Sequence, residues 1–187
     1  MKDLTGKNIA ILATNGFEQS ELFVPLDKLR NAGAQVHVVS PETGTITGWN
    51  KTNWGESVSV DRALDEVDQS EYDALVIPGG QINPDILRTK PKAVELVKGF
   101  YKAQKPIAAI CHGPWLLVEA DIVRGRRATS YHSIKTDMIN AGAQWEDSEV
   151  ATDQGIITSR HPGDLDAFCD KIAEEVLEGK HPQRAVA

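Results

Sequence analysis

The stretch Lys105-Pro-Ile-Ala-Ala-Ile-Cys-His-Gly-Pro-Trp115 decides how this chain folds. Residues 106–110 form a short apolar run, which predicts a strand buried on both faces. The Cys-His-Gly sequence at 111–113 then predicts a sharp turn. Pro114 suits the first position of a helix, where a missing N–H costs nothing. A strand, a tight turn and a helix with a cysteine at the corner form the arrangement known as a nucleophile elbow.

Cys111 has two interpretations at this corner. In the first, its thiol stands over a helix N-terminus, whose partial positive charge favours the thiolate and makes the residue reactive. In the second, it is a buried structural cysteine, since cysteine is among the most buried residue types. The His-Gly-Pro sequence that follows favours the reactive interpretation, because a packing cysteine does not need it.

The composition is that of one soluble domain. The chain has 187 residues, 25% of them charged and 41% hydrophobic, with a net charge of −7. We expect a single domain over residues 1–187, with a polar C-terminal tail at 179–187. The acidic balance argues against a nucleic-acid-binding surface. The sequence has no apolar run of membrane-spanning length and no evident signal peptide, and its two distant cysteines predict no disulfide, so we expect a cytoplasmic protein.

The chain on either side of this stretch alternates between strand-like and helix-like patterns. A strand at 8–14, a helix at 21–32 and a strand at 35–40 predict a right-handed crossover in a parallel sheet. The same patterns predict further strands at 74–78 and 156–159 and helices at 91–104 and 164–177. The predicted fold is therefore α/β, with a mostly parallel central sheet and helices on both faces. Residues 45–61 predict a loop or a short hairpin, in which Trp49 and Trp54 either pack locally or contact a partner.

Loops at the carboxyl ends of parallel strands form the ligand site of such a sheet. Here these loops hold Glu18, the Gly79-Gly80 pair and Cys111-His112. A partly buried Glu18 would have a raised pKa and would donate a hydrogen bond to a Cys111 thiolate. Its alternative is a surface acid or a helix-start charge. The backbone N–H groups of Gly80 and His112 are candidates for an oxyanion hole.

The histidines and the second cysteine leave several options open. His112 is a candidate base for Cys111, but side chains of neighbouring residues at a tight turn tend to diverge, so a carboxylate elsewhere is an alternative partner for it. His161 is a rival base, whereas His37 and Cys169 fit packing roles. We find no CxxC or HExxH spacing, no phosphate loop and no GxGxxG, so we expect no metal and no cofactor.

Several of these segments together resemble one family. The sequences AAICHGPWLL, VIPGG and TSYHSIKTDMINAGAQW, with Glu18 after the first strand, resemble the ThiJ/PfpI superfamily, a class I glutamine amidotransferase-like group, and within it the PfpI intracellular-protease-like branch. The resemblance implies a flavodoxin-like three-layer sandwich and a homodimer or larger homo-oligomer with its site near a subunit interface. It also implies Cys111 as the nucleophile, Glu18 as its protonated partner and His112 beside them.

Three activities are candidates, and the resemblance implies the first two. The first, which we favour, is a stress-response enzyme that acts on methylglyoxal or its protein adducts without a cofactor, as a glyoxalase III or a deglycase. The second is an intracellular cysteine peptidase, in which an acid after the Gly-Gly loop reaches the histidine of a neighbouring subunit. Here that position is Asp85, one methylene shorter than the glutamate of the protease branch. The third is a redox sensor or chaperone that depends on oxidation of Cys111. The expected partner is a small carbonyl substrate or a peptide, with no nucleic acid and no membrane.

Overall fold

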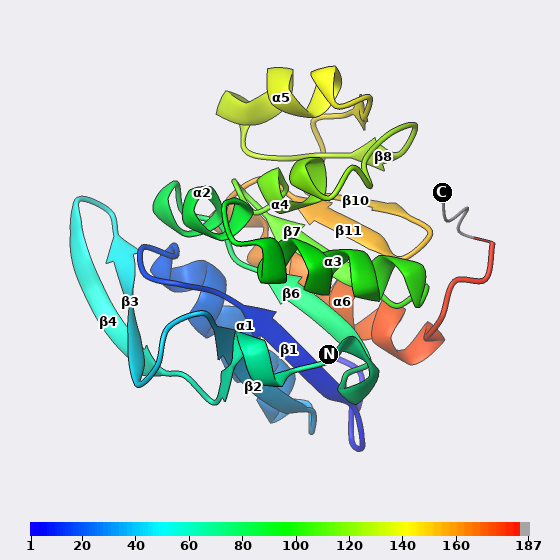
Figure 1. Cartoon of the computed structure of the whole chain (residues 1–187). Helices are drawn as coiled ribbons and strands as arrows, with labels where there is room; N and C mark the ends of the chain where they lie inside the picture. Colours follow the sequence, from blue (N-terminus) through cyan, green and yellow to red (C-terminus); the bar gives the residue numbers. More distant parts are fainter. Residues whose placement is uncertain (184–187) are drawn as a thin grey trace.

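The computed structural model describes residues 1–183, and its centre is a seven-stranded sheet (Figure 1). The strand order is β10-β11-β7-β6-β1-β2-β5, and every pairing in it is parallel except that of β10 with β11. This confirms the predicted mostly parallel sheet. The strands are β1 (Asn8–Leu12), β2 (Gln35–Ser40), β5 (Arg62–Ala63), β6 (Ala74–Ile77), β7 (Ile107–Ile110), β10 (Val150–Asp153) and β11 (Ile156–Ser159).

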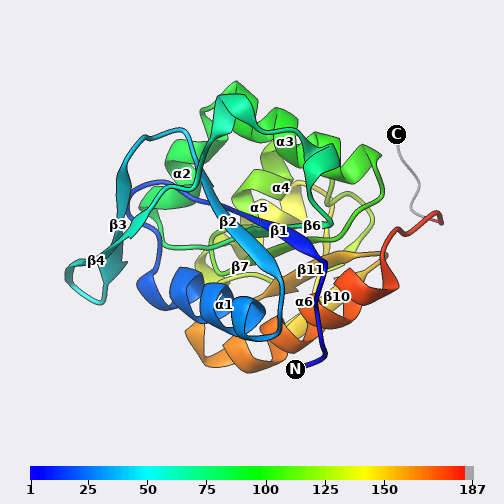
Figure 2. The same ribbon diagram turned by 90° about the horizontal axis from the view of Figure 1, so that it is seen from below.

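Helices cover both faces of this sheet, as predicted. Figure 2 shows α1 and α6 side by side on one face and α2, α3 and α4 on the other. Each face has its own apolar core, one centred on Phe17 and Phe168 and the other on Phe100. The helices are α1 (Gln19–Asn31), α2 (Ile82–Arg88), α3 (Pro91–Lys102), α4 (Trp115–Glu119), α5 (Lys135–Asn140) and α6 (Leu165–Glu178). None of the helices within residues 1–183 combines the length and apolar character needed to cross a membrane.

Hydrophobic spacing explains which helix faces are buried. On α6 the apolar residues at helical spacing are buried, namely Leu165, Phe168, Cys169, Ile172 and Val176. Cys169 is therefore a packing residue, with no exposed surface. On α3, Val97 and Phe100 are fully buried, and Val94 and Tyr101 are half-buried against the same core.

The strand order places a topological switch point between β1 and β6. From β1 the chain moves outward to β2, and it later returns to the other side of β1 as β6 and then β7. The loops that leave β1 and β6 therefore diverge to opposite faces and open a crevice at the carboxyl ends of the strands, which is where ligands bind in open α/β sheets. The loop after β7, which carries Cys111, reaches the same edge.

A separate hairpin stands beside this crevice. It is formed by β3 (Thr45–Asn50) and β4 (Asn53–Ser59), which confirms the hairpin alternative for residues 45–61 (Figure 1). Its first strand is held by backbone hydrogen bonds from Gly16 N to Thr47 O, at 2.8 Å, and from Trp49 N to Phe17 O, at 2.7 Å. Trp49 and Trp54 pack edge to face, with ring centroids 5.5 Å apart. The hairpin is thus fixed against the loop that follows β1.

The remaining chain adds only short pieces to this arrangement. A two-residue strand, β8 (Arg127–Ala128), pairs with β9 (Gln144–Trp145) outside the main sheet, whereas β10 is an edge strand of the main sheet. Of the predicted polar tail at 179–187, residues 184–187 lie outside the described part of the chain.

We predict that Phe168→Ala destabilises the fold by about 3–5 kcal/mol, because it removes a fully buried ring from the core between α6 and the sheet. Leu177→Ala on the same helix is the matched control; its side chain is 42% exposed, so we expect a change within about 0.5 kcal/mol. Urea unfolding measures both. Equal losses of stability in the two variants would contradict the assignment of the buried face.

Candidate active site

Cys111 lies at the turn between β7 and α4, as the elbow prediction requires. Its φ of +63° is in the left-handed region, which a non-glycine residue rarely adopts and which costs about 1–3 kcal/mol. Backbone hydrogen bonds hold this conformation, from Cys111 N to Ser159 O at 3.0 Å and from Tyr131 N to Cys111 O at 2.8 Å. A side chain on Gly113 would approach Ile77 O to 2.7 Å, so the turn requires glycine there.

The Cys111 side chain borders a cavity of about 500 Å³ at the crevice. Cys111 is 7% exposed, so it is nearly buried yet reaches this space. The hairpin contributes Trp49 and Lys51 to the wall, and the sheet loops contribute most of the rest. The lining residues are Gly16, Glu18, Glu21, Trp49, Lys51, Gly80, Gln81, Ile82, Cys111, His112, Tyr131 and Pro162.

The two predicted backbone donors both point at the sulfur. The N–H groups of Gly80 and His112 donate hydrogen bonds to Cys111, and each lowers the pKa of its thiol. Gly80 has a φ of +80°, and a side chain there would approach Gly16 O to 2.5 Å. The structure thus places both N–H groups where the sequence predicted an oxyanion hole.

The carboxyl group at the sulfur belongs to Glu21 and not to Glu18, which corrects the sequence-based assignment. Glu21 is the third residue of α1 and is fully buried. Its Oε2 accepts a hydrogen bond from Gly79 N at 2.8 Å, and its side chain also hydrogen-bonds Cys111. Glu18 precedes the helix and is half-buried at the cavity wall, where it accepts a hydrogen bond from Ser20 Oγ at 3.3 Å.

Helix geometry explains this correction. Residue 18 precedes the first turn of α1, whereas residue 21 lies one turn further along, on the stripe that continues through Pro25 and Leu29. The sequence did contain a signal for Glu21, namely an acid on an otherwise apolar, buried stripe of the helix. A charged group is rarely buried without a partner, so such an acid indicates a functional contact.

Burial sets the protonation of the Glu21–Cys111 pair. Burial, and secondarily the charge of Glu18, raise the pKa of Glu21 to about 8, against the lowering effect of the Gly79 hydrogen bond. Burial also raises the pKa of the Cys111 thiol and outweighs the amides of Gly80 and His112, and the Glu21 carboxylate adds to this increase once it is ionised. The prediction that the helix N-terminus leaves a low-pKa thiol is therefore wrong for the resting protein. The two groups titrate as a pair.

His112 reaches Cys111 after all. Its Nδ1 lies 3.2 Å from Cys111 Sγ, and its Nε2 lies 3.1 Å from Ser133 Oγ. The partner at Nε2 is thus a hydroxyl, where the sequence suggested a carboxylate. Burial, and then the charge of His132, lower the pKa of His112, so its imidazole is neutral near pH 7.

Two other predicted candidates lie elsewhere. His161 caps the short helical turn Pro162–Asp164 through its Nδ1, which accepts from Gly163 N at 3.1 Å, and it does not line the cavity. Asp85 is exposed in the first turn of α2, also outside the cavity wall. Within this chain, then, neither side chain joins Cys111 and His112.

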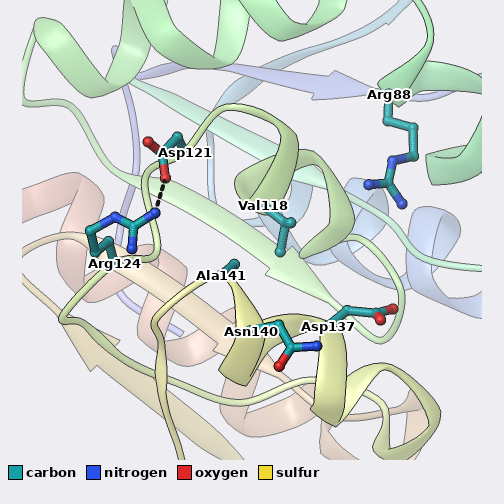
Figure 3. A pocket seen from close by; sticks show the side chains of 7 residues that line it. All are labelled: Arg88, Val118, Asp121, Arg124, Asp137, Asn140 and Ala141. Atoms are coloured by element: carbon teal, nitrogen blue, oxygen red, sulfur yellow. Dashed lines mark hydrogen bonds and ion pairs between the residues drawn. The ribbon is translucent and has the colours of Figure 1, made fainter.

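A second hollow lies on the outer surface near α4 and α5 (Figure 3). Arg124 donates to Asp121 at 3.3 Å across its rim. Asp137 accepts from Trp115 Nε1 at 2.8 Å, and Arg88 lies over the Trp115 ring. These charged groups already have partners, and the hollow offers no nucleophile, so it is not a candidate active site.

One group of side chains has the composition of a metal site. Among residues 1–183, Glu175, Glu178 and His181 bring their ligand atoms within 4.8 Å of one another near the end of α6. Glu175 is already in an ion pair with His181, at 2.9 Å. This group is not part of the cavity wall that contains Cys111.

The fold and this site define a class of α/β proteins that carry a cysteine at the strand–helix turn of a switch-point crevice. The chain belongs to the DJ-1/PfpI family, whose model matches residues 7–175. Deglycase PfpI of Pyrococcus furiosus is 46% identical over 160 residues, which are 86% of this chain and 93% of that protein. The protein of Bacillus subtilis named "putative cysteine protease YraA" is 44% identical over 163 residues, 87% of this chain and 94% of the other.

A solved structure supports the same assignment. A two-domain protein from Anabaena variabilis, with DJ-1/ThiJ/PfpI-like and ferritin-like domains, superposes with a TM-score of 0.87 at 36% identity. The match covers 96% of this chain and 52% of that protein, so this chain spans about half of its length.

We predict that Glu21→Gln flattens the pH dependence of stability between pH 4.5 and 8. A carboxyl whose pKa is raised on folding stabilises the protein below its unfolded value and loses that contribution as the pH rises through about 8. The wild-type free energy of unfolding should therefore fall by about 2 kcal/mol or more over this interval relative to Glu21→Gln.

Glu18→Gln is the comparison variant, and we expect a smaller change because Glu18 is only half-buried. Urea unfolding at a series of pH values measures all three proteins. Curves for wild type and Glu21→Gln that run parallel would show that Glu21 is not the buried acid of the site.

Proposed function

We propose that this protein is a cysteine-dependent enzyme that acts on small reactive carbonyl compounds, methylglyoxal or its protein adducts, as a glyoxalase III or a deglycase. The observation that carries the proposal is the environment of Cys111. One sulfur at a cavity has two backbone donors, a buried acid of raised pKa and an uncharged histidine around it.

The first step is attack of Cys111 Sγ on the aldehyde carbon. A C–S bond forms, and the electron pair of the C=O bond moves to oxygen, which gives a hemithioacetal alkoxide. The N–H groups of Gly80 and His112 stabilise this oxygen, because fixed donors stabilise charge as it develops. The thiol proton leaves to a neighbouring acceptor.

Lactate formation from methylglyoxal then needs only proton transfers and water. The hydrogen of the former aldehyde carbon moves to the ketone carbon through an enediol. This transfer oxidises the first carbon by two electrons and reduces the second by two. The product is a lactoyl thioester, which water hydrolyses to lactate and free Cys111. Glu21 is suited to exchange these protons, since its pKa of about 8 is close to neutral pH. It takes the role that the sequence analysis gave to Glu18.

The names of relatives support this choice of chemistry. Several relatives of comparable similarity are named deglycases, and they match over 93% of their own length. Release of a carbonyl group from a protein adduct uses the same nucleophile and the same oxyanion donors. The homo-oligomer and the cytoplasmic location expected from the sequence remain predictions.

A cysteine peptidase is the second candidate, favoured by the 3.2 Å contact between Cys111 Sγ and His112 Nδ1. In this proposal Asp85 of a second subunit completes the triad. The sensor or chaperone role ranks lower, because oxidation favours exposed thiolates whereas Cys111 is 7% exposed and has a raised pKa.

For the carbonyl enzyme, we predict that Cys111→Ser lowers the rate of lactate formation from methylglyoxal at least about 100-fold, because a hydroxyl is a far weaker nucleophile than a thiolate. Cys169→Ala removes the other thiol, from the core of α6, and should keep the activity in the folded protein. A coupled assay for lactate measures the rate. Equal rates for wild type and Cys111→Ser would reject the proposal.

For the peptidase, cleavage of a fluorogenic peptide by the purified protein should disappear in Asp85→Ala. Asp121→Ala, which removes another exposed acid, is the matched control and should retain cleavage. Purified wild-type protein that cleaves no peptide would exclude this candidate.

A further inference from the structure

His112 is held at both of its nitrogens within one chain. Nδ1 contacts Cys111 Sγ at 3.2 Å, and Nε2 contacts Ser133 Oγ at 3.1 Å. Ser133 belongs to the short helical turn His132–Ile134 that follows β8, so it reaches the ring from a separate part of the chain. Ser133 itself is exposed, whereas His112 is 4% exposed.

Aromatic packing fixes the plane of the imidazole between these contacts. Tyr131 stacks on it with centroids 4.9 Å apart and an interplanar angle of 28°. Trp115 meets it edge to face at 5.2 Å. Because the ring is enclosed in this way, Nδ1 stays directed at the sulfur and Nε2 at the hydroxyl.

The tautomer of His112 decides which of its nitrogens can accept the proton of Cys111. The Ser133 hydroxyl can donate or accept at Nε2, and the Nε2–H form is the one in which Ser133 Oγ accepts. A neutral imidazole has one N–H, and the nitrogen without it is the acceptor. When Nε2–H donates to Ser133 Oγ, the lone pair of Nδ1 faces Cys111 and accepts its proton. In that transfer the S–H bond breaks and an Nδ1–H bond forms, which leaves a thiolate beside an imidazolium whose second N–H still donates to Ser133.

Glu21 does not compete for this proton at neutral pH. With a pKa of about 8, its carboxyl is mostly protonated below that pH. Of the two side chains in contact with the sulfur, His112 in its Nε2–H tautomer is then the one with a basic lone pair, because a carboxyl that is already protonated is a very weak base. Nδ1 of His112 is therefore the nearby acceptor for the thiol proton. Whether Nδ1 can accept this proton depends on the tautomer of His112.

We propose that Ser133 is a positioning residue, which holds the Nε2–H tautomer of His112 and so makes Nδ1 the base for Cys111 within a single subunit. The inference rests on the proposed role of Cys111 as the nucleophile. It assigns to a serine of the same chain the place that the sequence analysis gave to Asp85 of a partner. Nε2 offers one hydrogen-bonding position, and Ser133 Oγ occupies it.

The test compares Ser133→Ala, Ser133→Thr and the control Ser148→Ala in the full chain. Ser148 Oγ donates to Glu146 Oε1 at 3.3 Å, so this control also removes a serine side-chain hydrogen bond, but one outside the site. The first readout is the rate of Cys111 alkylation by iodoacetamide from pH 5 to 10, with mass spectrometry to separate it from Cys169. The second is the ¹⁵N chemical shifts of the His112 ring, which report its tautomer.

We expect Ser133→Ala to slow alkylation near pH 7 about ten-fold, the loss for one hydrogen bond to a group that becomes charged. Its His112 should also lose the predominance of the Nε2–H tautomer. Ser133→Thr keeps the hydroxyl and should retain most of the rate and the wild-type ring signals, and Ser148→Ala should match the wild type. Thermal unfolding of each variant checks the fold, which replacement of an exposed serine should preserve.

Three results would overturn the proposal. They are an unchanged pH profile and tautomer in Ser133→Ala, equal losses in Ser133→Ala and Ser133→Thr, or a loss in Asp85→Ala that Ser133→Ala does not show. Neither readout uses a substrate. A wild type that makes no lactate but whose alkylation rate and tautomer follow Ser133 would refute the proposed function and leave this inference supported.

Discussion

The left-handed backbone conformation of Cys111 is the constraint on which the whole site depends. With φ at +63°, the chain turns sharply at one residue, and the thiol borders the crevice while it packs against the apolar core. This strain persists only because the surroundings hold it, through the backbone bonds to Ser159 and Tyr131. The same turn directs the N–H of His112 at the sulfur of the preceding residue. A relaxed turn would separate these groups.

The Gly79-Gly80 loop after β6 packs against the turn at Cys111. A side chain on Gly79 would approach Glu21 Oε2 to 2.5 Å and Cys111 Cβ to 2.6 Å, so this backbone lies between the acid and the cysteine. Asn83 holds the loop from α2, since its Nδ2 donates to Pro78 O at 2.9 Å and its Oδ1 accepts from Thr14 N at 2.7 Å. The position of the acid relative to the sulfur is therefore set by backbone packing, with little freedom left to either side chain.

The strongly patterned parts of the fold could be predicted from the sequence. The strand Gln35–Ser40 has its predicted bounds, and α6 (Leu165–Glu178) lies within one residue of the helix predicted at 164–177, because apolar spacing alone specifies both. The location of Cys111 and of both backbone donors also follows from local sequence, since a strand and a turn determine them. The predictions that were wrong concern features that depend on three-dimensional packing. Helix rotation decides between Glu18 and Glu21, and the raised pKa of Cys111 comes from burial that no local motif reveals. The contact of His112 with Ser133 joins residues that are 21 positions apart.

The donors of Gly80 and His112 connect the resting protein to its chemistry. In the resting state they point at Cys111 Sγ, where they partly offset the burial that disfavours a thiolate. In the proposed reaction the sulfur attacks a carbonyl carbon and the negative charge moves to an oxygen two bonds away, where the same N–H groups would stabilise it. Under this proposal the same two amides act on the sulfur before bond formation and on the oxygen after it. The proposed reaction is therefore compatible with a thiol of raised pKa, because the charge passes from sulfur to an oxygen that fixed donors stabilise.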